Sequence, residues 1–321
     1  MGPVGSILAL HLQAGGAEVI VCDTDKEKMN LVRQKGITLE NCFRKAGFFR
    51  YVHTSVSEIG VYDPEIIVCA VKGHHLGAVL EGLAQIRTEQ TYIVSAQNGI
   101  DIEREYLGVF GEDKVLRMVI NFAGNLHAPN VVNVSFFQSP NYIASVNDRC
   151  REVAEDFSEC LSRSGLTTQI SDSFGLPRYV WEKTILNAAL SALCAVTRFT
   201  MKEAMEYPGT MEIVEQTIEE AVAVAHCEDI FFDNHFVKHC LRYLRQGGQH
   251  LPSLAVDVMN GRETEIRYFN GKIVAYGRKH YIRTPLNLAF TNMIEAMTRK
   301  GTFPGSEAQE IKDIIHQPTP A

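Results

Sequence analysis

Blocks of apolar and polar positions alternate along the first half of the chain, and their lengths predict helices and strands in turn. An apolar helix over residues 6–13 is followed by a hydrophobic strand over residues 18–22. The nearly continuous apolar runs at residues 66–71 and 91–95 are typical of parallel strands that are covered on both faces. The other elements expected in this half are helices at 25–35, 76–83 and 149–163, strands at 52–56 and 167–170, and β-structure over 115–146 with turns at Gly124-Asn125 and Ser139-Pro140.

Beyond residue 172 the pattern changes to helical periodicity alone. We therefore expect an α/β domain with a doubly wound sheet over residues 1–172 and an all-helical domain over residues 173–321. The helices expected in the second domain span residues 179–199, 202–207, 210–227, 233–246 and 286–299.

Composition and charge narrow the range of partners. The 321 residues are 45% hydrophobic and 21% charged, which is an ordinary globular composition with enough material for two domains. A net charge of −7 without any basic block argues against nucleic acid, and no apolar run approaches the roughly 18 residues that span a membrane. Eight cysteines stand singly without C-x-x-C spacing, so we expect no metal site and a reducing, cytoplasmic setting.

The start of the chain carries part of a nucleotide-binding motif. Gly2 and Gly5, with Pro3 and Val4 between them, match the second and third glycines of the dinucleotide fingerprint G-x-G-x-x-G. Such glycines let the backbone approach a pyrophosphate at a helix N-terminus. The first glycine and its strand are missing, so we expect the reading frame to begin upstream and Met1 to be an internal methionine. A helix-capping turn is the alternative, but the helix, strand and acidic residue that come next in register favour a Rossmann-type site.

Three polar residues stand where predicted strands end, and open α/β sheets bind ligands at that edge. Asp23 ends the second strand of the motif, where a carboxylate can accept hydrogen bonds from ribose hydroxyls and repel a 2′-phosphate. It therefore favours NAD(H) over NADP(H), with a helix cap as the alternative. Lys72 and Asn98 follow the next two buried strands and are expected to face one cleft. A solvated lysine and an ordinary Asn-Gly turn are the alternatives.

The helical half carries two further groups of polar residues. Lys183 and Asn187 are four residues apart and share one helix face, which Ser191 extends by a turn. The helix around them is apolar, so the lysine is either a structural partner or a proton donor tuned by desolvation. The second group contains Ser253 and Glu265, and the glutamate stands at the edge of an apolar segment.

Together these residues resemble the ketopantoate reductase (2-dehydropantoate 2-reductase) family over almost the whole chain, apart from the missing first strand. The resemblance implies a Rossmann domain joined to a helical domain, with the active site in the cleft between them. The matching segments are Gly2-Pro3-Val4-Gly5, Val71-Lys72, Gln97-Asn98-Gly99, Trp181-Glu182-Lys183 with Asn187, Ser253 with Asp257, residues 261–266, and Asn270-Gly271 leading to Pro285.

The resemblance also implies the reaction and the role of each residue. The reaction is reduction of a small 2-oxo acid, such as 2-dehydropantoate, by hydride transfer from a nicotinamide cofactor, in pantothenate biosynthesis. Lys183 takes the position of the catalytic acid/base, Glu265 that of the residue orienting the substrate hydroxyl, and Lys72 a position near cofactor and substrate. The glycine turn (Gly2, Pro3, Val4 and Gly5), Asp23, Lys72 and Asn98 are the positions expected to hold the cofactor, and a homodimer is the expected assembly. The substrate-contacting positions are those of Asn98, Asn187, Ser191 and Ser253.

Three departures from the family pattern leave the substrate open. The family usually has an arginine for the NADPH phosphate where this chain has Cys22-Asp23-Thr24. Ser191 replaces a second asparagine, and His250 stands in a segment where an asparagine and a second serine are common before Ser253. A reductase of a different 2-oxo acid, an opine-type dehydrogenase and a non-catalytic NAD-binding protein remain the alternatives.

Overall fold

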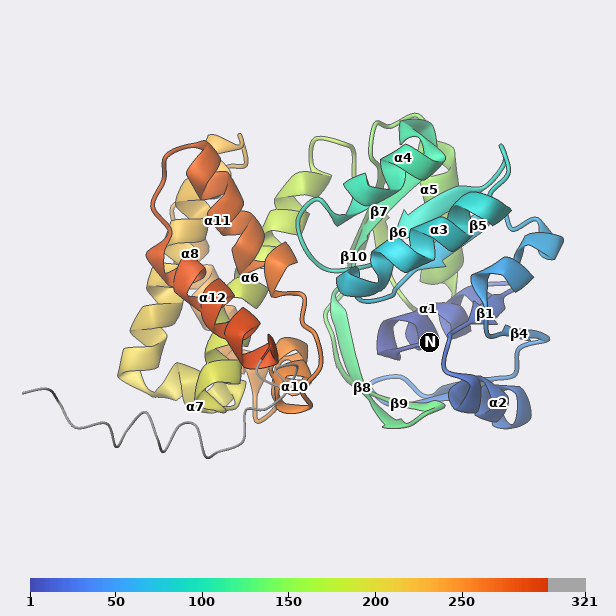
Figure 1. Ribbon diagram of the computed structural model, residues 1–321, viewed down its shortest axis with the longest axis horizontal. Helices are drawn as coiled ribbons and strands as arrows, with labels where there is room; N and C mark the ends of the chain where they lie inside the picture. The colour runs from blue at the N-terminus through green and yellow to red at the C-terminus, as the bar shows by residue number, and fades with distance from the viewer. Residues whose placement is uncertain (300–321) are drawn as a thin grey trace, which may run out of the picture. The chain divides into compact units, whose positions relative to one another are not determined.

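The computed structural model describes residues 1–299, which form two compact units (Figure 1). The first unit is Met1–Thr184, and the second begins at Ile185. The division falls inside one long helix, α6 (Leu176–Thr197). The domain boundary expected at residue 172 lies shortly before this helix and stays a prediction.

The main sheet of the first unit has five strands in the order β11-β10-β7-β6-β5. The apolar runs near residues 66 and 91 form parallel neighbours in it, which confirms the two strands expected there. The antiparallel pairing of β10 with β7 makes the sheet mixed. Its strands are β5 (Ile66–Cys69), β6 (Tyr92–Ser95), β7 (Val115–Val119), β10 (Asn141–Ser145) and β11 (Thr168–Ile170).

A separate parallel pair joins β1 (Ile20–Cys22) to β4 (Tyr51–His53). The strand expected at 52–56 is thus shorter and ends at His53. Helix α1 (Pro3–Ala14) is the first described element, and within residues 1–299 no ladder joins this pair to the five-stranded sheet. The expected upstream strand concerns residues outside this sequence and stays a prediction.

A third sheet of four strands has the order β3-β2-β9-β8. The sequence pattern did not predict β2 and β3, because both are short and their apolar positions are interrupted by polar or charged side chains. The turn expected at Gly124-Asn125 is wrong, since both residues lie inside β8. A side chain at Gly124 would meet the Asn133 carbonyl oxygen at 2.9 Å, at a register shift between β8 and β9. The strands are β2 (Ile37–Asn41), β3 (Lys45–Gly47), β8 (Phe122–Ala128) and β9 (Val131–Phe137).

Five helices and short 3₁₀ segments accompany these sheets, and Figure 1 shows α3 drawn across the strands of the main sheet. The core includes the apolar face of α1, whose Ile7 and Leu8 are fully buried. Gly15 lets α1 pack closely on α5, because a side chain there would overlap the Cys160 carbonyl oxygen. The helices are α1, α2 (Lys26–Lys35), α3 (Leu76–Ile86), α4 (Leu107–Phe110) and α5 (Arg151–Arg163), with η1 (Val56–Glu58), η2 (Gly60–Tyr62), η3 (Gly73–His75), η4 (Ile102–Tyr106) and η5 (Glu112–Lys114).

The described part of the second unit is helical, as the sequence pattern predicts. Two of its helices, α10 and α11, were not predicted individually. Buried side-chain amides join four helices: Asn270 of α11 donates to the Ala188 carbonyl of α6 and to Asn287 of α12, and Asn287 donates to Glu220 of α8. The elements after α6 are α7 (Met201–Glu206), α8 (Pro208–Cys227), α9 (Phe236–Leu244), η6 (Arg245–Gly247), α10 (Ser253–Met259), η7 (Ile266–Tyr268), α11 (Asn270–Lys279) and α12 (Pro285–Arg299).

Candidate functional site

The N-terminus of α1 has the properties of an anion-binding helix end. Pro3 occupies the first helical position, no side chain caps the helix, and its first turn contains no acidic residue. A side chain added at Gly2 would meet nothing within 4 Å, so the backbone there is open to a ligand. At Gly5 an added side chain would make only ordinary contacts, at 3.6 Å with Met1 Sδ and 3.8 Å with Ala70 Cβ just beyond β5, so space alone does not demand a glycine there. The amides at this end therefore fit a pyrophosphate.

Asp23 follows β1, and its carboxylate is held by several donors. Oδ1 accepts from the Asp25 amide at 2.9 Å, and Oδ2 accepts from Lys28 Nζ at 3.1 Å and from the Met1 ammonium. Burial raises the pKa of Asp23, but these cationic and hydrogen-bonding neighbours outweigh it and lower the pKa to about 2. The side chain that caps α2 is Asp25, which accepts from the Lys28 amide at 3.0 Å.

Asn98 lies in the loop that follows β6, between two residues whose carbonyls are bound by one buried guanidinium. Arg117 of β7, only 2% exposed, donates from Nη1 to the Gln97 carbonyl and from Nη2 to the Gly99 carbonyl at 2.9 Å. Its Nε forms an ion pair with Glu103 at 3.5 Å. Asn98 itself remains half-buried.

The Gln97 side chain joins this loop to the end of β5. Its Nε2 donates to the Val71 carbonyl at 2.9 Å, immediately before Lys72. Its Oε1 accepts from the Tyr106 hydroxyl at 2.5 Å. The structure therefore brings the segments of Lys72 and Asn98 together, as expected from their positions at neighbouring strand ends.

Sequence reasoning missed both Arg117 and the role of Gln97. The available signal was the arginine itself, which stands in the otherwise apolar run Val115-Leu116-Arg117-Met118-Val119. A charged residue in a strand buried at every position needs hydrogen-bonding partners. Which loop supplies them depends on sheet order, and that order is a tertiary property.

Helix α6 carries Lys183, Asn187 and Ser191 at successive turns of one face. Part of Lys183 remains exposed, but the protein packed around it removes water and lowers the pKa of its ammonium to about 8. Next to it, Thr184 Oγ1 is buried without a hydrogen-bond partner among the described residues. Trp181, the sole tryptophan of the chain, is 5% exposed in the same turn of the helix.

The second polar group lies in the second unit. Ser253 is the first residue of α10, and Asp257 of that helix is buried and ion-paired with Arg262 at 3.3 Å. Glu265 precedes η7 and is only 7% exposed, which agrees with a carboxylate at the edge of an apolar segment.

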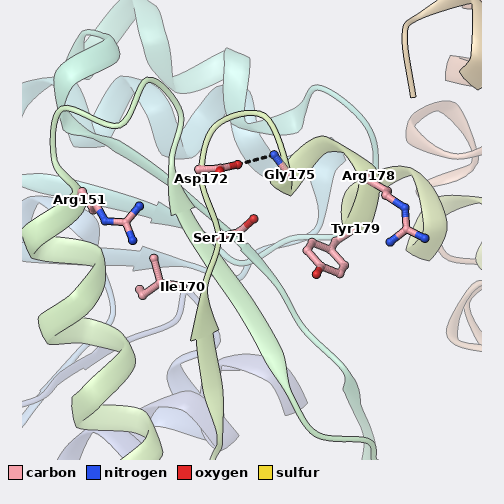
Figure 2. A pocket seen from close by; sticks show the side chains of 7 residues that line it. All are labelled: Arg151, Ile170, Ser171, Asp172, Gly175, Arg178 and Tyr179. Carbon is pink, nitrogen blue, oxygen red and sulfur yellow. Dashed lines mark hydrogen bonds between the residues drawn. The ribbon is translucent and has the colours of Figure 1, made fainter. Parts of the chain in front are cut away.

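A hollow in the first unit contains none of the predicted site residues. It has a volume of about 320 Å³ and lies where β11 leads into α6. Figure 2 shows Arg151 and Arg178 on opposite sides of it, with the Asp172 carboxylate accepting from the Gly175 amide at 2.6 Å. In the second unit a hollow of about 430 Å³ between α7 and η6 also lacks them.

Two classes of site are not found in the described residues. None of the helices over residues 1–299 combines the length and apolar character of a membrane crossing. In the same part of the chain, no group of three or more histidine, cysteine, aspartate or glutamate side chains is arranged to hold a metal ion.

These features define a Rossmann-type α/β unit joined to a helical unit. Family comparison is consistent with that arrangement, since "Ketopantoate reductase PanE/ApbA" matches residues 1–148 and "Ketopantoate reductase PanE/ApbA C terminal" matches residues 176–298. The chain belongs to the ketopantoate reductase family, which confirms the resemblance drawn from its motifs.

Individual relatives cover nearly the same length. A 2-dehydropantoate 2-reductase from Aquifex aeolicus is 26% identical over 303 residues, or 92% of this chain and 94% of the relative. One from Lactococcus lactis is 24% identical over 92% of this chain and 95% of its own length.

Solved structures share the fold. D-mandelate dehydrogenase, in a ternary structure with NADH and anilino(oxo)acetate, has a TM-score of 0.83 at 23% identity, covering 94% of this chain and 97% of that one. A PanE/ApbA family ketopantoate reductase from Ralstonia eutropha has the same TM-score at 20% identity, with the same coverage.

Proposed function

We propose that this protein is an oxidoreductase that reduces a small 2-oxo acid to the 2-hydroxy acid with a nicotinamide cofactor. The observation that carries the proposal is Lys183, a desolvated ammonium in α6 whose pKa lies near 8, with Asn187 one turn further on. Family membership supports the same reaction, because the curated relatives are named 2-dehydropantoate 2-reductases. A proton donor with a pKa close to neutral is well matched to a ketone that becomes an alkoxide.

Residues of the first unit hold the cofactor in this proposal. The open amides of the turn from Gly2 to Gly5 bind the pyrophosphate, and Asp23 accepts hydrogen bonds from the adenosine ribose. Lys72 lies toward cofactor and substrate. The bound nicotinamide supplies the hydride that reduces the ketone carbon.

The remaining roles concern the substrate and its proton. Lys183 donates a hydrogen bond to the ketone oxygen and protonates it as negative charge develops. Glu265 keeps the new hydroxyl oriented toward that ammonium. The anchors for the rest of the substrate are Asn98, Asn187, Ser191 and Ser253.

Steady-state turnover tests the proposal directly. Wild type is assayed with NADH and with NADPH against 2-dehydropantoate and against 2-oxo acids with other aliphatic and with aromatic side chains. Turnover of at least one of these acids, abolished by heat denaturation of the protein, is the expected result. Tight NADH binding without turnover of any member of the panel would contradict the enzymatic proposal and favour a non-catalytic NAD-binding role.

The acid that is turned over best is a separate question. A second candidate substrate is a 2-oxo acid other than 2-dehydropantoate, and two pocket substitutions favour it. Ser191 stands where the family often has a second asparagine, and His250 stands in a segment where an asparagine and a second serine are common, so the groups facing the far end of the substrate differ. The similar fold of D-mandelate dehydrogenase makes the aromatic members of the panel a useful comparison. An opine-type reaction predicts that turnover also requires an amine.

The preferred cofactor is NADH in this proposal. Asp23 places a carboxylate where the ribose is read, and Asp25 lies two residues away, so a 2′-phosphate meets like charge. Lys28 at 3.1 Å from Asp23 offsets part of this repulsion, and the expected preference for NADH is on the order of fivefold or more. Changing Asp23→Ser together with Thr24→Arg should narrow or reverse the ratio of kcat/KM between the two cofactors. A wild-type preference for NADPH would assign the phosphate to Lys28 or another cation.

Assembly and compartment complete the proposal. One neighbouring structure is described as a dimeric ketopantoate reductase from Staphylococcus aureus, and we infer a homodimer here as well. Sedimentation velocity at several concentrations tests this, with a single monomeric species as the contrary result. All eight cysteines are free thiols, which suits the reducing cytoplasm.

A further inference from the structure

We propose that Gln97 and Arg117 are positioning residues that hold the segments of Lys72 and Asn98 at one fixed spacing, so that cofactor and substrate are presented together. This inference rests on the proposed function for its catalytic consequence. The coupling of the two segments can also be measured without turnover.

Arg117 fixes the backbone on both sides of Asn98. Its guanidinium donates to the Gln97 and Gly99 carbonyls, which precede and follow that residue, and also to Ser95 Oγ at 3.3 Å. Two planar donors from one side chain set the distance between two carbonyls in a way that a single point charge cannot. Asn98 therefore sits on a backbone segment whose two flanking peptide groups move as one.

Gln97 extends the same support to the neighbouring strand end. Its Nε2 reaches the Val71 carbonyl at 2.9 Å, while its Oε1 is fixed by the Tyr106 hydroxyl at 2.5 Å. Gln97 and Tyr106 are 4% and 0% exposed, so water does not replace either bond. A shift of the loop at Asn98 must therefore move the peptide group before Lys72, or break a buried hydrogen bond.

The ladder of the sheet does not need this arrangement. The last backbone bond between β5 and β6 joins the Ala96 amide to the Cys69 carbonyl at 3.0 Å, before the loop begins. Beyond that point the two segments are joined through side chains instead. Burying an arginine and Glu103 beside a sheet costs free energy that hydrophobic residues would avoid, which points to a positional requirement at this loop.

The test uses graded variants of the support. Gln97→Leu removes the hydrogen bonds to Val71, to Tyr106 and to Ser95 Oγ. Gln97→Glu keeps the acceptor for Tyr106 but loses the donor to Val71, and Tyr106→Phe removes only the hydroxyl. Arg117→Lys keeps the positive charge but cannot donate to the Gln97 and Gly99 carbonyls at the same time in the geometry of the guanidinium. Arg149→Lys is the matched control, because Arg149 is exposed and, within residues 1–299, its guanidinium is bonded only to the side chain of Asp113 at 3.0 Å.

Two readouts separate positioning from general destabilisation. Amide hydrogen exchange should become at least tenfold faster in both segments, residues 71–75 and 97–101, in Gln97→Glu and Gln97→Leu. Turnover should fall with them: KM for the 2-oxo acid rises about tenfold or more and kcat decreases, while the NADH dissociation constant changes less than threefold. Tyr106→Phe should give a smaller change in the same direction, and Arg149→Lys none.

The possible outcomes are distinct. Faster exchange confined to residues 97–101 would overturn the coupling, as would normal KM and kcat in a variant in which both segments exchange faster. If Gln97→Leu does not fold, Gln97→Glu and Tyr106→Phe carry the same comparison. If wild type turns over no 2-oxo acid, the proposed function fails, and the exchange measurements alone decide whether the segments are coupled.

Discussion

At the scale of single residues, burial has different consequences for two basic side chains that each stand in a largely apolar helical run. Lys183 and His11 both lose water. The lysine keeps part of its surface exposed and remains able to exchange a proton near neutral pH. His11 is 0% exposed, donates from Nδ1 to the Ile7 carbonyl at 2.7 Å, and packs its ring edge-on against Phe43. The first is suited to proton transfer, and the second contributes to the core.

Replacement of the lysine should affect chemistry more than binding. Lys183→Ala is expected to lower kcat by roughly 10²–10⁴-fold, the usual contribution of a general acid, with NADH affinity nearly unchanged. Because the pKa of Lys183 is lowered to about 8 by desolvation, wild-type kcat for reduction should fall as pH rises through 8, where the ammonium is lost. The pH profile of kcat measures this. Full turnover by a folded Lys183→Ala protein would contradict the proton-donor role and indicate that Lys183 is a structural residue.

His11 should make the fold sensitive to acid. Burial lowers its pKa from 6.5 to about 4, so the unfolded chain binds a proton more readily than the folded one. The contribution of neutral His11 to the free energy of unfolding is fully present above pH 6.5 and is lost as pH falls toward 4. The total loss is about 3 kcal/mol. His11→Phe keeps a ring beside Phe43 and should flatten the dependence measured by urea unfolding. The exposed His239→Phe serves as the control and should leave the wild-type slope intact; a similar slope in His11→Phe would contradict the assignment.

At the scale of elements, local pattern is readable from the sequence, whereas the influence of neighbouring strands is not. The runs that became β5 and β6 are mostly apolar, and Asp25 caps α2 as a helix-starting residue should. Strand β3 is only Lys45-Ala46-Gly47, and it exists because β2 pairs with it. Gly124 looked like a turn residue, but it is a glycine because the neighbouring strand approaches too closely for a side chain.

The candidate site divides in the same way. Lys183, Asn98 and Glu265 could be proposed from residue type, position and the family resemblance, and their roles stay predictions. Arg117 was not, because its partners are carbonyls whose positions depend on how β6 and β7 pair. A residue such as Arg117, which holds a loop that follows the neighbouring strand, is not marked by any helical or strand spacing, so a single sequence does not reveal its role.

The contact between α1 and α5 gives a steric prediction. Gly15 has ordinary right-handed backbone angles, so Gly15→Ala tests space alone. The new methyl group would overlap the Cys160 carbonyl oxygen, and we expect about 1–3 kcal/mol of destabilisation from the forced separation of the helices. Gly108→Ala in α4 meets nothing within 4 Å and should be neutral or slightly stabilising. Chemical denaturation compares them, and equal stabilities would refute the close contact.

At the scale of the whole molecule, cofactor binding and folding are linked. The proposed nucleotide contacts come from three segments far apart in the chain, the turn before α1, the end of β1 and the loop after β5. A ligand that binds only when these segments are assembled stabilises the folded state by mass action. The effect does not depend on which acid is reduced.

Thermal unfolding in the presence of each cofactor should therefore report the nucleotide preference without any substrate. NADH at about 100 times its dissociation constant is expected to stabilise the protein by about 2.7 kcal/mol, and the same concentration of NADPH by less. Differential scanning fluorimetry or calorimetry measures the change in Tm. AMP and free nicotinamide serve as controls for partial occupancy. An equal or larger shift with NADPH would reverse the proposed preference.

Trp181 provides an intrinsic fluorescent probe close to Lys183 in the sequence. It is the sole source of indole emission, it is shielded from water, and it lies two residues before Lys183 in one turn of α6. Its emission band overlaps the absorption of reduced nicotinamide, so excitation energy can pass from the indole to bound NADH and be re-emitted by the cofactor. Unlabelled wild-type protein thus allows stopped-flow observation of cofactor arrival at one known place, separately from the absorbance change that accompanies hydride transfer.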